Sequence, residues 1–252
     1  CIRDRITGIH FDGCSTSGTG AGSVEKHGGC GFKVLGATTN PSPSARHENI
    51  RFTNCTVEDV TPGMASHNFA GFNIGKSKNV VLDNCIVRKV NGPSSAAYGF
   101  ALLGSENVSI INPTVEDTVG AAIKLYSAET TTEYQFGTPA TDVHITGGTL
   151  RRTTAGLLIE GGGATLRRIT MDGTTIDGGV YAVSVGSSIL NRCSFDFLAS
   201  GITTATLNGC ETAMVSGRGD LVGASPARGG STFHDYGSYQ MKVYRSDGWS
   251  AL

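Results

Sequence analysis

The sequence has little charge, few prolines and aromatic residues, and no long apolar run. Charged residues make up 16% of the 252 residues, and 20 Lys and Arg against 21 Asp and Glu leave a net charge of −1. This balance excludes the basic surface that nucleic acids require, so we expect no nucleic-acid partner. No apolar stretch approaches the roughly 18 residues of a membrane-spanning helix, so we expect no membrane insertion.

Cysteine is present, but its pattern excludes the usual cysteine-based sites. The seven cysteines are an odd number, no two have CxxC spacing, and no histidine lies at metal-ligand spacing from them. We therefore expect buried, mostly reduced thiols, which suit folding in a cytoplasm, and neither a metal nor a cofactor. The chain begins at Cys1 without a charged and apolar leader, so we expect it to lack an original N-terminal part.

Glycine is abundant, and a repeated pattern orders the residues between the glycines. The 36 glycines, with Thr, Ser, Asn, Val and Ile along the whole chain, are typical of short strands joined by turns. Four copies, about 30 residues apart, begin with Asn or Asp, and the first three share an Asn at an internal turn. The copies are NIRFTNCTVEDV (49–60), NVVLDNCIVRKV (79–90), NVSIINPTVEDT (107–118) and DVHITGGTLRRT (142–153).

A second repeated segment lies between these copies. Both segments alternate apolar and variable residues with period two, which predicts strands with one buried face. Two or three such strands in every 20–35 residues or so, without a helical period, predict an all-β parallel solenoid. We expect it over residues 1–215, followed by a C-terminal loop and terminal strand segment over 216–252. The second segment reads GFKVL (31–35), GFNIG (71–75), GFALL (99–103), AIKLY (122–126), GLLIE (156–160) and AVSVG (182–186).

Variable coil length favours a right-handed parallel β-helix, because a left-handed hexapeptide solenoid requires stricter spacing. With these repeats, the chain resembles the pectate-lyase-like superfamily of right-handed β-helix proteins over about residues 6–214. That superfamily includes polysaccharide lyases, glycoside hydrolases, epimerases and the tailspikes with which bacteriophages bind and cut surface glycans. The acidic motifs of polygalacturonases and the calcium-binding Asp cluster of pectate lyases are missing, and only Ile123-Lys124 matches a polygalacturonase motif.

Tailspikes fit the remaining features best, since they combine reduced cysteines, a preceding particle-binding domain and a non-solenoid C-terminal end. This resemblance implies a receptor-binding protein of the virion, assembled in the host cytoplasm as a homotrimer, that binds and depolymerises a bacterial surface polysaccharide. Two alternatives stay open: a non-catalytic adhesin or tail fibre, and a free secreted polysaccharide lyase or hydrolase. Tailspikes share no catalytic motif, so the resemblance assigns no residue a role.

One predicted outward surface combines a cation, a phenol and carboxylates on neighbouring coils. Carboxylates perform acid–base chemistry on sugars, and aromatic faces stack on sugar rings. A hydrolase would pair Glu160 with Glu129 or Glu133, whereas a lyase would use Lys124 to neutralise a uronate and Tyr126 to move the proton. A solvated loop over a chance mixture of polar residues is the alternative. The candidate substrate-binding residues are Tyr134, Phe136, Tyr98, Lys33 and Asn73.

Two outward columns of alternating charge predict a salt-bridge ladder that sets the register of the coils. The alternation ends where Asp196 falls beside Asp177, and two carboxylates about 5 Å apart would suit a retaining glycosidase. Some outward positions are instead apolar, which predicts burial against a partner chain or a long loop. The charged columns are Glu58, Arg88, Glu116, Arg151 and Asp177, and Asp59, Lys89, Asp117 and Arg152; the apolar residues are Leu35, Ala101, Leu103, Leu158, Val81 and Ile111.

Overall fold

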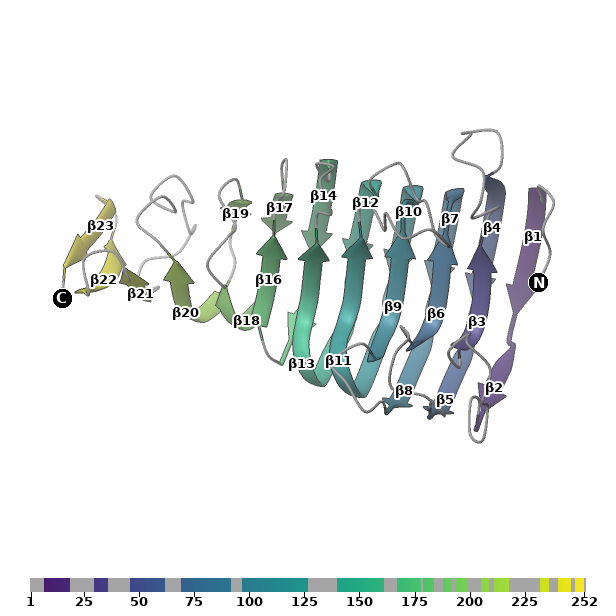
Figure 1. Cartoon of the computed structure of the whole chain (residues 1–252). Coiled ribbons are helices and arrows are strands. Elements are labelled where there is room, and N and C mark those ends of the chain that lie inside the picture. Colours follow the sequence, from purple (N-terminus) through teal and green to yellow (C-terminus); the bar gives the residue numbers. More distant parts are fainter. Residues whose placement is uncertain are drawn as a thin grey trace, which may run out of the picture.

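The structure is a computed structural model in which every described element is a β-strand. Figure 1 shows the strands side by side along one axis, from the N-terminus (purple) to the C-terminal end (yellow). None of the residues it describes forms a helix able to cross a membrane. The described residues are 7–18, 30–35, 46–61, 69–91, 97–126, 140–160, 167–177, 179–183, 188–191, 194–198, 205–208, 211–217, 232–235, 240–245 and 248–251.

Eight parallel strands form the first face of the solenoid. Neighbouring strands come from successive coils, so that Ile50 pairs with Val80 and Val80 pairs with Val108. The predicted repeats therefore stack in register. The strands are β1 (Thr7–Asp12), β4 (His47–Thr53), β7 (Ser77–Asp83), β10 (Glu106–Ile111), β12 (Thr141–Thr146), β14 (Arg167–Asp172), β17 (Ser188–Asn191) and β19 (Ala205–Asn208).

The other two faces belong to one fifteen-stranded sheet that turns a corner. Strands β11 (Thr114–Tyr126) and β13 (Thr149–Glu160) run through the corner, and their pairing shifts between Thr118 and Ala121. The second face holds their first parts with β2 (Ser15–Ser17), β5 (Thr56–Val60), β8 (Ile86–Val90), β15 (Thr175–Ile176), β18 (Ser194–Leu198) and β20 (Glu211–Gly217). The third face holds their second parts with β3 (Cys30–Leu35), β6 (Phe69–Gly75), β9 (Ala97–Leu103) and β16 (Gly179–Val183).

The strand pairing changes at the C-terminal end. Strand β21 (Thr232–Asp235) still pairs in parallel with β20. Strands β22 (Gln240–Arg245) and β23 (Gly248–Ala251) then follow in antiparallel order. The predicted boundary at residue 215 falls within β20, two residues before that strand ends.

Columns of identical or similar side chains fill the interior. A fully buried aliphatic column on the second face consists of Val57, Val87, Val115, Leu150 and Ile176, paired in that order. These are the inward positions that the period-two pattern predicts. Because each branched side chain rests on the one in the next coil, the column keeps adjacent coils in register.

Phenylalanines stack beside this column near the N-terminal coils. Phe11 stacks on Phe52 with ring centroids 4.7 Å apart, and Phe72 stacks on Phe32 and on Phe100, each at 5.1 Å. Aromatic pairs of this kind contribute about 0.5–1.5 kcal/mol beyond the apolar area that they bury. Phe52 of the first face also packs edge-to-face on Phe72 of the third face, with ring centroids 5.4 Å apart, so the two faces contact each other through their inward rings.

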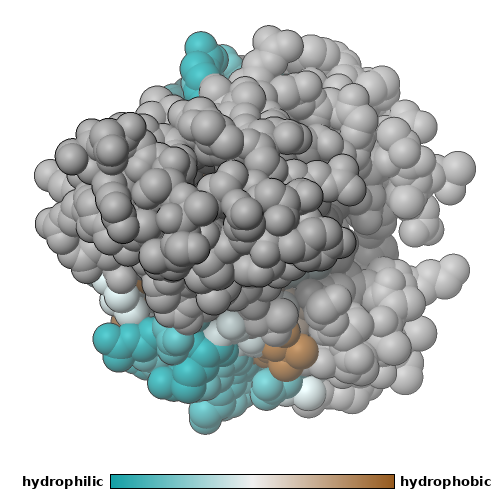
Figure 2. Space-filling model, turned by 90° about the vertical axis from the view of Figure 1, so that its left-hand side faces the viewer, coloured by the Kyte–Doolittle hydropathy of each residue, from teal (hydrophilic) through white to brown (hydrophobic). Residues whose placement is uncertain are grey.

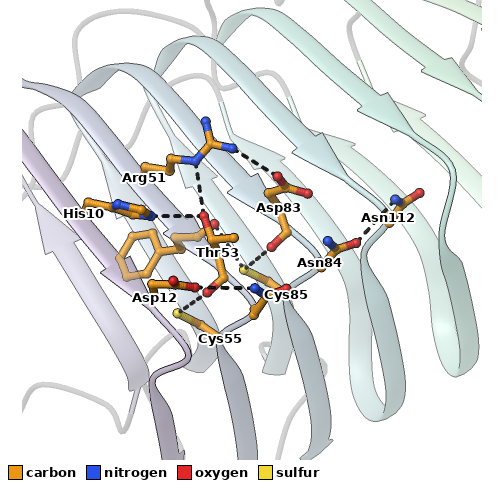
Figure 3. Close-up of polar contacts among 11 residues, drawn as sticks. His10, Asp12, Arg51, Thr53, Cys55, Asp83, Asn84, Cys85 and Asn112 are labelled. Carbon is orange, nitrogen blue, oxygen red and sulfur yellow. Dashed lines mark hydrogen bonds and ion pairs between the residues drawn. The ribbon is translucent and has the colours of Figure 1, made fainter.

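A left-handed residue turns each described coil from the first face to the second. Asn54, Asn84 and Asn112 have φ of 54°, 52° and 47°, a region that asparagine tolerates better than other side chains. The amide Nδ2 of Asn112 donates to Oδ1 of Asn84 at 3.3 Å, so the turns also bond to one another (Figure 3). Gly147 takes this position one coil later, with φ of 64°.

A second asparagine ladder crosses the first face. Asn79 Nδ2 donates to Asn49 Oδ1 at 3.0 Å, and Asn107 Nδ2 donates to Asn79 Oδ1 at 2.8 Å. All three residues have positive φ near 55°. These asparagines therefore serve the fold, because each amide bonds the next coil and each backbone needs a residue that accepts this conformation.

The cysteine column follows the turn. Cys55 and Cys85 are buried, Cys14 and Cys30 are half-buried, and all four are free thiols. Burial raises the pKa of Cys85 to about 12 and also raises the pKa of Cys55. The prediction of buried, reduced thiols is confirmed for Cys55 and Cys85. Cys1, Cys193 and Cys210 lie outside the described residues.

Candidate functional site

The third face places five of the outward residues singled out from the sequence in one register column. Lys33 pairs with Asn73, Asn73 with Ala101, Ala101 with Lys124, and Lys124 with Leu158. The next pairing differs from the sequence alignment, because Leu158 pairs with Tyr181 rather than with Ser184. The coil between Leu158 and Tyr181 is therefore shorter than the spacing of the repeats predicts.

Lys124 and Tyr98 form the best-defined polar contact on this face. Lys124 Nζ donates to Tyr98 Oη at 2.8 Å and lies 4.5 Å from the centroid of the same ring. The two residues are 5% and 4% exposed, so water has little access to either. An ammonium in contact with both the oxygen and the π-face of a phenol is strongly oriented. Sequence reasoning named both residues but did not pair them.

Small residues surround the phenol. Ala70, Ala101 and Ala121 form a buried cluster with Tyr98, separate from the main core. Asn73 is 6% exposed on the same column, and its Nδ2 donates to Cys30 Sγ at 3.6 Å. The outer side of β6, β9 and β11 thus carries small and polar residues that are buried within the single chain. Lys33, by contrast, is exposed.

The remaining residues predicted for this surface are only partly described. Tyr126 pairs with Glu160 in the register of β11 and β13, so their backbones lie on adjacent strands, as the repeats predict. Their side chains are outside the described part of the structure. Glu129, Glu133, Tyr134 and Phe136 also lie outside the described residues. Their predicted acid–base and stacking roles stay predictions.

Two of the outward apolar residues are buried without a second chain. Ala101 and Leu103 are buried in the single chain, so their burial needs no partner subunit to explain it. Val81 and Ile111, on the first face, are half-buried. Exposure of apolar residues therefore gives no argument for a trimer at these positions. The side chains of Leu35 and Leu158 are outside the described residues.

The predicted salt-bridge ladder is present on the second face. Arg88 bridges two glutamates, with Nη1 at 3.0 Å from Glu58 Oε1 and Nε at 3.3 Å from Glu116 Oε2. The hydrogen bond that Arg88 donates to Glu58 raises the pKa of Arg88, and the one that it donates to Glu116 raises it further. One step differs from the prediction: Arg152 at 3.9 Å, and not Arg151, is the arginine of the next coil that contacts Glu116.

The neighbouring column continues the ladder. Lys89 Nζ lies 3.5 Å from Asp59 Oδ1, and Arg152 Nη2 donates to Asp117 Oδ2 at 2.9 Å. The hydrogen bond from Arg152 lowers the pKa of Asp117 and the same bond raises the pKa of Arg152.

Figure 2 views the molecule from its C-terminal end and shows that the described surface visible there is mainly hydrophilic, with one small hydrophobic area.

The candidate carboxylate pair at the end of the ladder is only half described. Asp177 is exposed, and its Oδ2 accepts from the backbone nitrogen of Arg152 at 3.4 Å. Thr175 pairs with Ser194, which would carry Asp177 toward Asp196, but the pairing has changed by one residue where Gly179 meets Phe197. The side chain of Asp196 is outside the described residues, so the pair stays a prediction.

Sequence reasoning missed a polar cluster on the outer side of the first face (Figure 3). Arg51 donates through Nε to Thr53 Oγ1 at 3.1 Å and through Nη2 to Asp83 Oδ2 at 3.1 Å. His10 Nε2 lies 3.2 Å from the same hydroxyl. The register column Asp12, Thr53 and Asp83, each just before the turn residue, was visible in the repeats as the position preceding Gly or Asn. These side chains hydrogen-bond to one another, as is usual on a solvent-exposed surface.

A second missed cluster lies where the third face turns into the first. Glu106 is held by Arg46 at 2.6 Å and by Lys78 at 3.4 Å. Lys76 is buried beside them, and desolvation, with the charge of Arg46, lowers the pKa of its ammonium. This network ties three coils together at the corner. In the described part of the chain, no three His, Cys, Asp or Glu residues gather to hold a metal.

Comparison with known families agrees with the geometry. Residues 7–200 match the family described as the right handed beta helix region. The chain belongs to this family. The predicted fold class, an all-β right-handed parallel β-helix, is thereby confirmed, as is the resemblance to parallel β-helix proteins in general. Searches of curated proteins and of solved structures returned no match.

Proposed function

We propose that this β-helix binds a bacterial surface polysaccharide and cuts it at the outer side of the third face. The family is consistent with proteins that act on polysaccharides. The observation that carries the proposal is the Lys124–Tyr98 contact, a cation and a phenol held at 2.8 Å with almost no exposure. Exclusion of water strengthens the electrostatic effect of a fixed cation on a reacting group.

The pair suits β-elimination on an acidic sugar. Lys124 would neutralise the carboxylate of a uronate, which makes the proton on the adjacent carbon easier to remove. Tyr98 would react as the phenolate, whose negative charge on Oη the adjacent ammonium stabilises. Oη would take that proton, the C–H electrons would form a C=C bond, and the C–O bond to the leaving sugar would break. The leaving oxygen would then take the proton from Tyr98 Oη, which restores the phenolate, and the products are a new chain end and an unsaturated uronate.

Hydrolysis is the alternative within the same proposal. It would use Glu160 with Glu129 or Glu133, or Asp177 with Asp196, as acid and base. Glu160 pairs with Tyr126, which lies two residues from Lys124 on β11, and this favours the first of these pairs over the second. Both reactions would act on the same class of polymer, but only elimination gives an unsaturated product.

The proposal also places the chain in the shaft of a phage tailspike, as a homotrimer of the virion assembled in the host cytoplasm. The free thiols of Cys14, Cys30, Cys55 and Cys85 support folding in a reducing compartment. The antiparallel strands β22 and β23 support a non-solenoid end of the kind that closes such a shaft. A free secreted enzyme would share the site but would be monomeric.

A non-catalytic adhesin is the second candidate, because Lys124 and Tyr98 also satisfy each other as a buried structural pair would. The test is incubation with a panel of bacterial capsules and O-antigens, with new reducing ends measured. Because removal of an acid–base partner costs a factor of about 10²–10⁴ in rate, Tyr98→Phe and Lys124→Ala should lose at least the lower figure. Lys89→Ala, an exposed lysine on the second face, is the control and should retain activity.

Binding without any new reducing ends would establish the adhesin instead. Activity of Tyr98→Phe and Lys124→Ala at the wild-type rate would move the reaction away from this pair. Gel filtration with light scattering tests the assembly: a trimer agrees with the tailspike proposal, and a monomer contradicts it.

A further inference from the structure

Two cysteines of adjacent coils stack just after the turn from the first face to the second. Ser15 pairs with Thr56 immediately beyond this turn, so Cys14 is in register with Cys55. The backbone nitrogen of Thr56 donates to the carbonyl oxygen of Cys14 at 2.8 Å. Residues stacked in this way have Cα atoms about 4.8 Å apart, and disulfides usually join Cα atoms roughly 4.4–6.8 Å apart. The backbone therefore holds this pair at the separation that a disulfide requires.

The thiol of Cys55 is directed toward the first coil, which contains β1, β2 and β3. Its Sγ lies 3.6 Å from the carbonyl oxygen of Phe11 in that coil and 3.3 Å from the carbonyl oxygen of Thr53 in its own coil. Burial raises the pKa of Cys55, and the charge of Cys14 and a hydrogen bond between the two side chains also raise it. The two thiols therefore contact each other in the reduced protein.

The position of the pair at the end of the solenoid decides which thiol an oxidant reaches. Cys14 is half-buried, whereas Cys55 and Cys85 are buried at 0% exposure, so a small oxidant reaches Cys14 first. Strands β1 and β2 stand at the ends of their sheets, and each pairs with a single strand in the described part of the chain. The first coil can therefore shift the short distance that the Cβ spacing of a disulfide, roughly 3.5–4.5 Å, requires.

The third thiol of the column, Cys85, does not compete for the same link. It lies one coil further from the end, and Figure 3 shows it on the coil next to Cys55. Burial raises its pKa to about 12, and only a thiolate attacks a disulfide. Cys85 therefore stays reduced when its two neighbours are joined.

We infer that Cys14 and Cys55 form a reversible disulfide, which joins the first coil to the second when the folded protein meets hydrogen peroxide. The sulfur of Cys14 attacks one peroxide oxygen, the O–O bond breaks, and the thiol proton leaves with the released hydroxide as water. The sulfur of Cys55 then attacks the sulfur of the Cys14 sulfenic acid, and its S–O bond breaks. The Cys55 proton leaves with that hydroxyl group as a second water.

In total, two thiols are oxidised and one peroxide is reduced to two waters. The link closes a long loop between Cys14 and Cys55, so it opposes unfolding that starts at this end of the solenoid. A chain that folds in a reducing compartment and later leaves it acquires the link after folding. This inference is independent of the proposed action on polysaccharides.

The test treats the full chain with hydrogen peroxide, blocks the remaining thiols and digests the protein with trypsin without reduction. Lys and Arg place Cys14, Cys30, Cys55 and Cys85 in four separate peptides, 6–26, 27–33, 52–76 and 79–88. Mass spectrometry should find 6–26 joined to 52–76, lighter by two hydrogen atoms than the two peptides together, and dithiothreitol should separate them. The unfolding midpoint of the oxidised protein should be about 5 °C or more above that of the reduced protein.

Three variants assign the roles of the two thiols. Cys14→Ser should form no link, and its midpoint should not respond to peroxide. Cys55→Ala leaves no partner for the sulfenic acid of Cys14, which dimedone should then trap on peptide 6–26. Cys30→Ser is the matched control, because Cys30 is half-buried like Cys14 but pairs with Ala70 rather than with a cysteine; it should keep the link.

Each of the other outcomes contradicts the inference. Reduced Cys14 and Cys55 at a peroxide concentration that oxidises free glutathione completely would overturn it. Sulfinic acid on Cys14 beside a reduced Cys55, or a link from Cys14 to another cysteine or to a second chain, would overturn it too. A link that forms but leaves the midpoint unchanged would show that it does not oppose unfolding from this end.

Discussion

Reversal of one charge in the ladder tests whether the coils depend on the register that the structure shows. Glu116 accepts a salt bridge from Arg88 at 3.3 Å and has a longer contact with Arg152 at 3.9 Å. Its in-register neighbours are Arg88 and Arg151. Glu116→Arg removes both attractions and places a third positive charge between two arginines.

The expected loss of stability follows from the exposure of the side chains in the ladder. The side chains of Arg88 and Glu116 are 41% and 23% exposed, so each lost bridge is worth only about 0.2–1 kcal/mol. Like charges directly opposite each other on adjacent strands destabilise by a similar amount. The free energy of unfolding of Glu116→Arg should therefore fall by about 1–2 kcal/mol at low ionic strength. For Glu116→Gln, which only loses the salt bridges, the free energy of unfolding should fall by about half as much.

Urea unfolding at low and high salt measures both effects. The Debye length falls from about 30 Å at 0.01 M salt to about 3 Å at 1 M, so salt should remove most of the difference between the Arg and Gln variants. Equal stability of Glu116→Arg and wild type at low salt would refute the reasoning, because it would mean that these side chains do not face one another. A difference that salt leaves unchanged would indicate a packing effect instead.

Three further predictions follow from the interior and the exposed ladder. Gly99→Ala should lose about 1–3 kcal/mol in urea unfolding, because the new Cβ would lie 2.5 Å from the carbonyl oxygen of Ala122; wild-type stability would contradict this packing. Cys85 should resist a thiol reagent at pH 8 until the protein unfolds, since burial raises its pKa to about 12, and rapid labelling of the native protein would show the burial to be wrong. The folded pKa of Asp117 is lowered by Arg152, so its contribution to stability is complete above the ordinary carboxyl pKa and is lost as the pH falls through the lowered value. Asp117→Asn should flatten that acid-side loss in a pH series of unfolding midpoints, and an unchanged profile would exclude the pairing.

The fold could be predicted from the sequence because successive repeats carry the same kind of turn residue and the same alternation of apolar residues. Asn54, Asn84 and Asn112 mark the turn in successive coils, and the inward valines between them alternate with period two. Within the described residues, the predicted register is wrong where the coils shorten, as at Tyr181, because the spacing of the repeats does not show how many residues a shorter turn contains. Periodicity therefore fixed the faces of the solenoid better than it fixed the length of each coil.

The site was harder to predict, for a physical reason. Alternation tells which side chains point outward, but not which outward side chains are covered, and Lys124, Asn73 and Ala101 are outward yet buried. Lys124 is in register with Ala101 and not with Tyr98, so the spacing of the repeats does not indicate the contact between Lys124 and Tyr98. Arg51 and its partners on the first face do not follow the expected pattern of carboxylates beside aromatic rings, so the sequence did not indicate them either.

Digestion of an acidic capsular polysaccharide in water enriched in heavy oxygen tests the central claim most directly. Elimination at the Lys124–Tyr98 pair predicts a product that is one water lighter than the hydrolysis product and contains no heavy oxygen, and it predicts that Tyr98→Phe forms almost none of it. Mass spectrometry of the released oligosaccharides reads both features at once. Heavy oxygen at the new reducing ends, or products formed equally by Tyr98→Phe, would contradict the account.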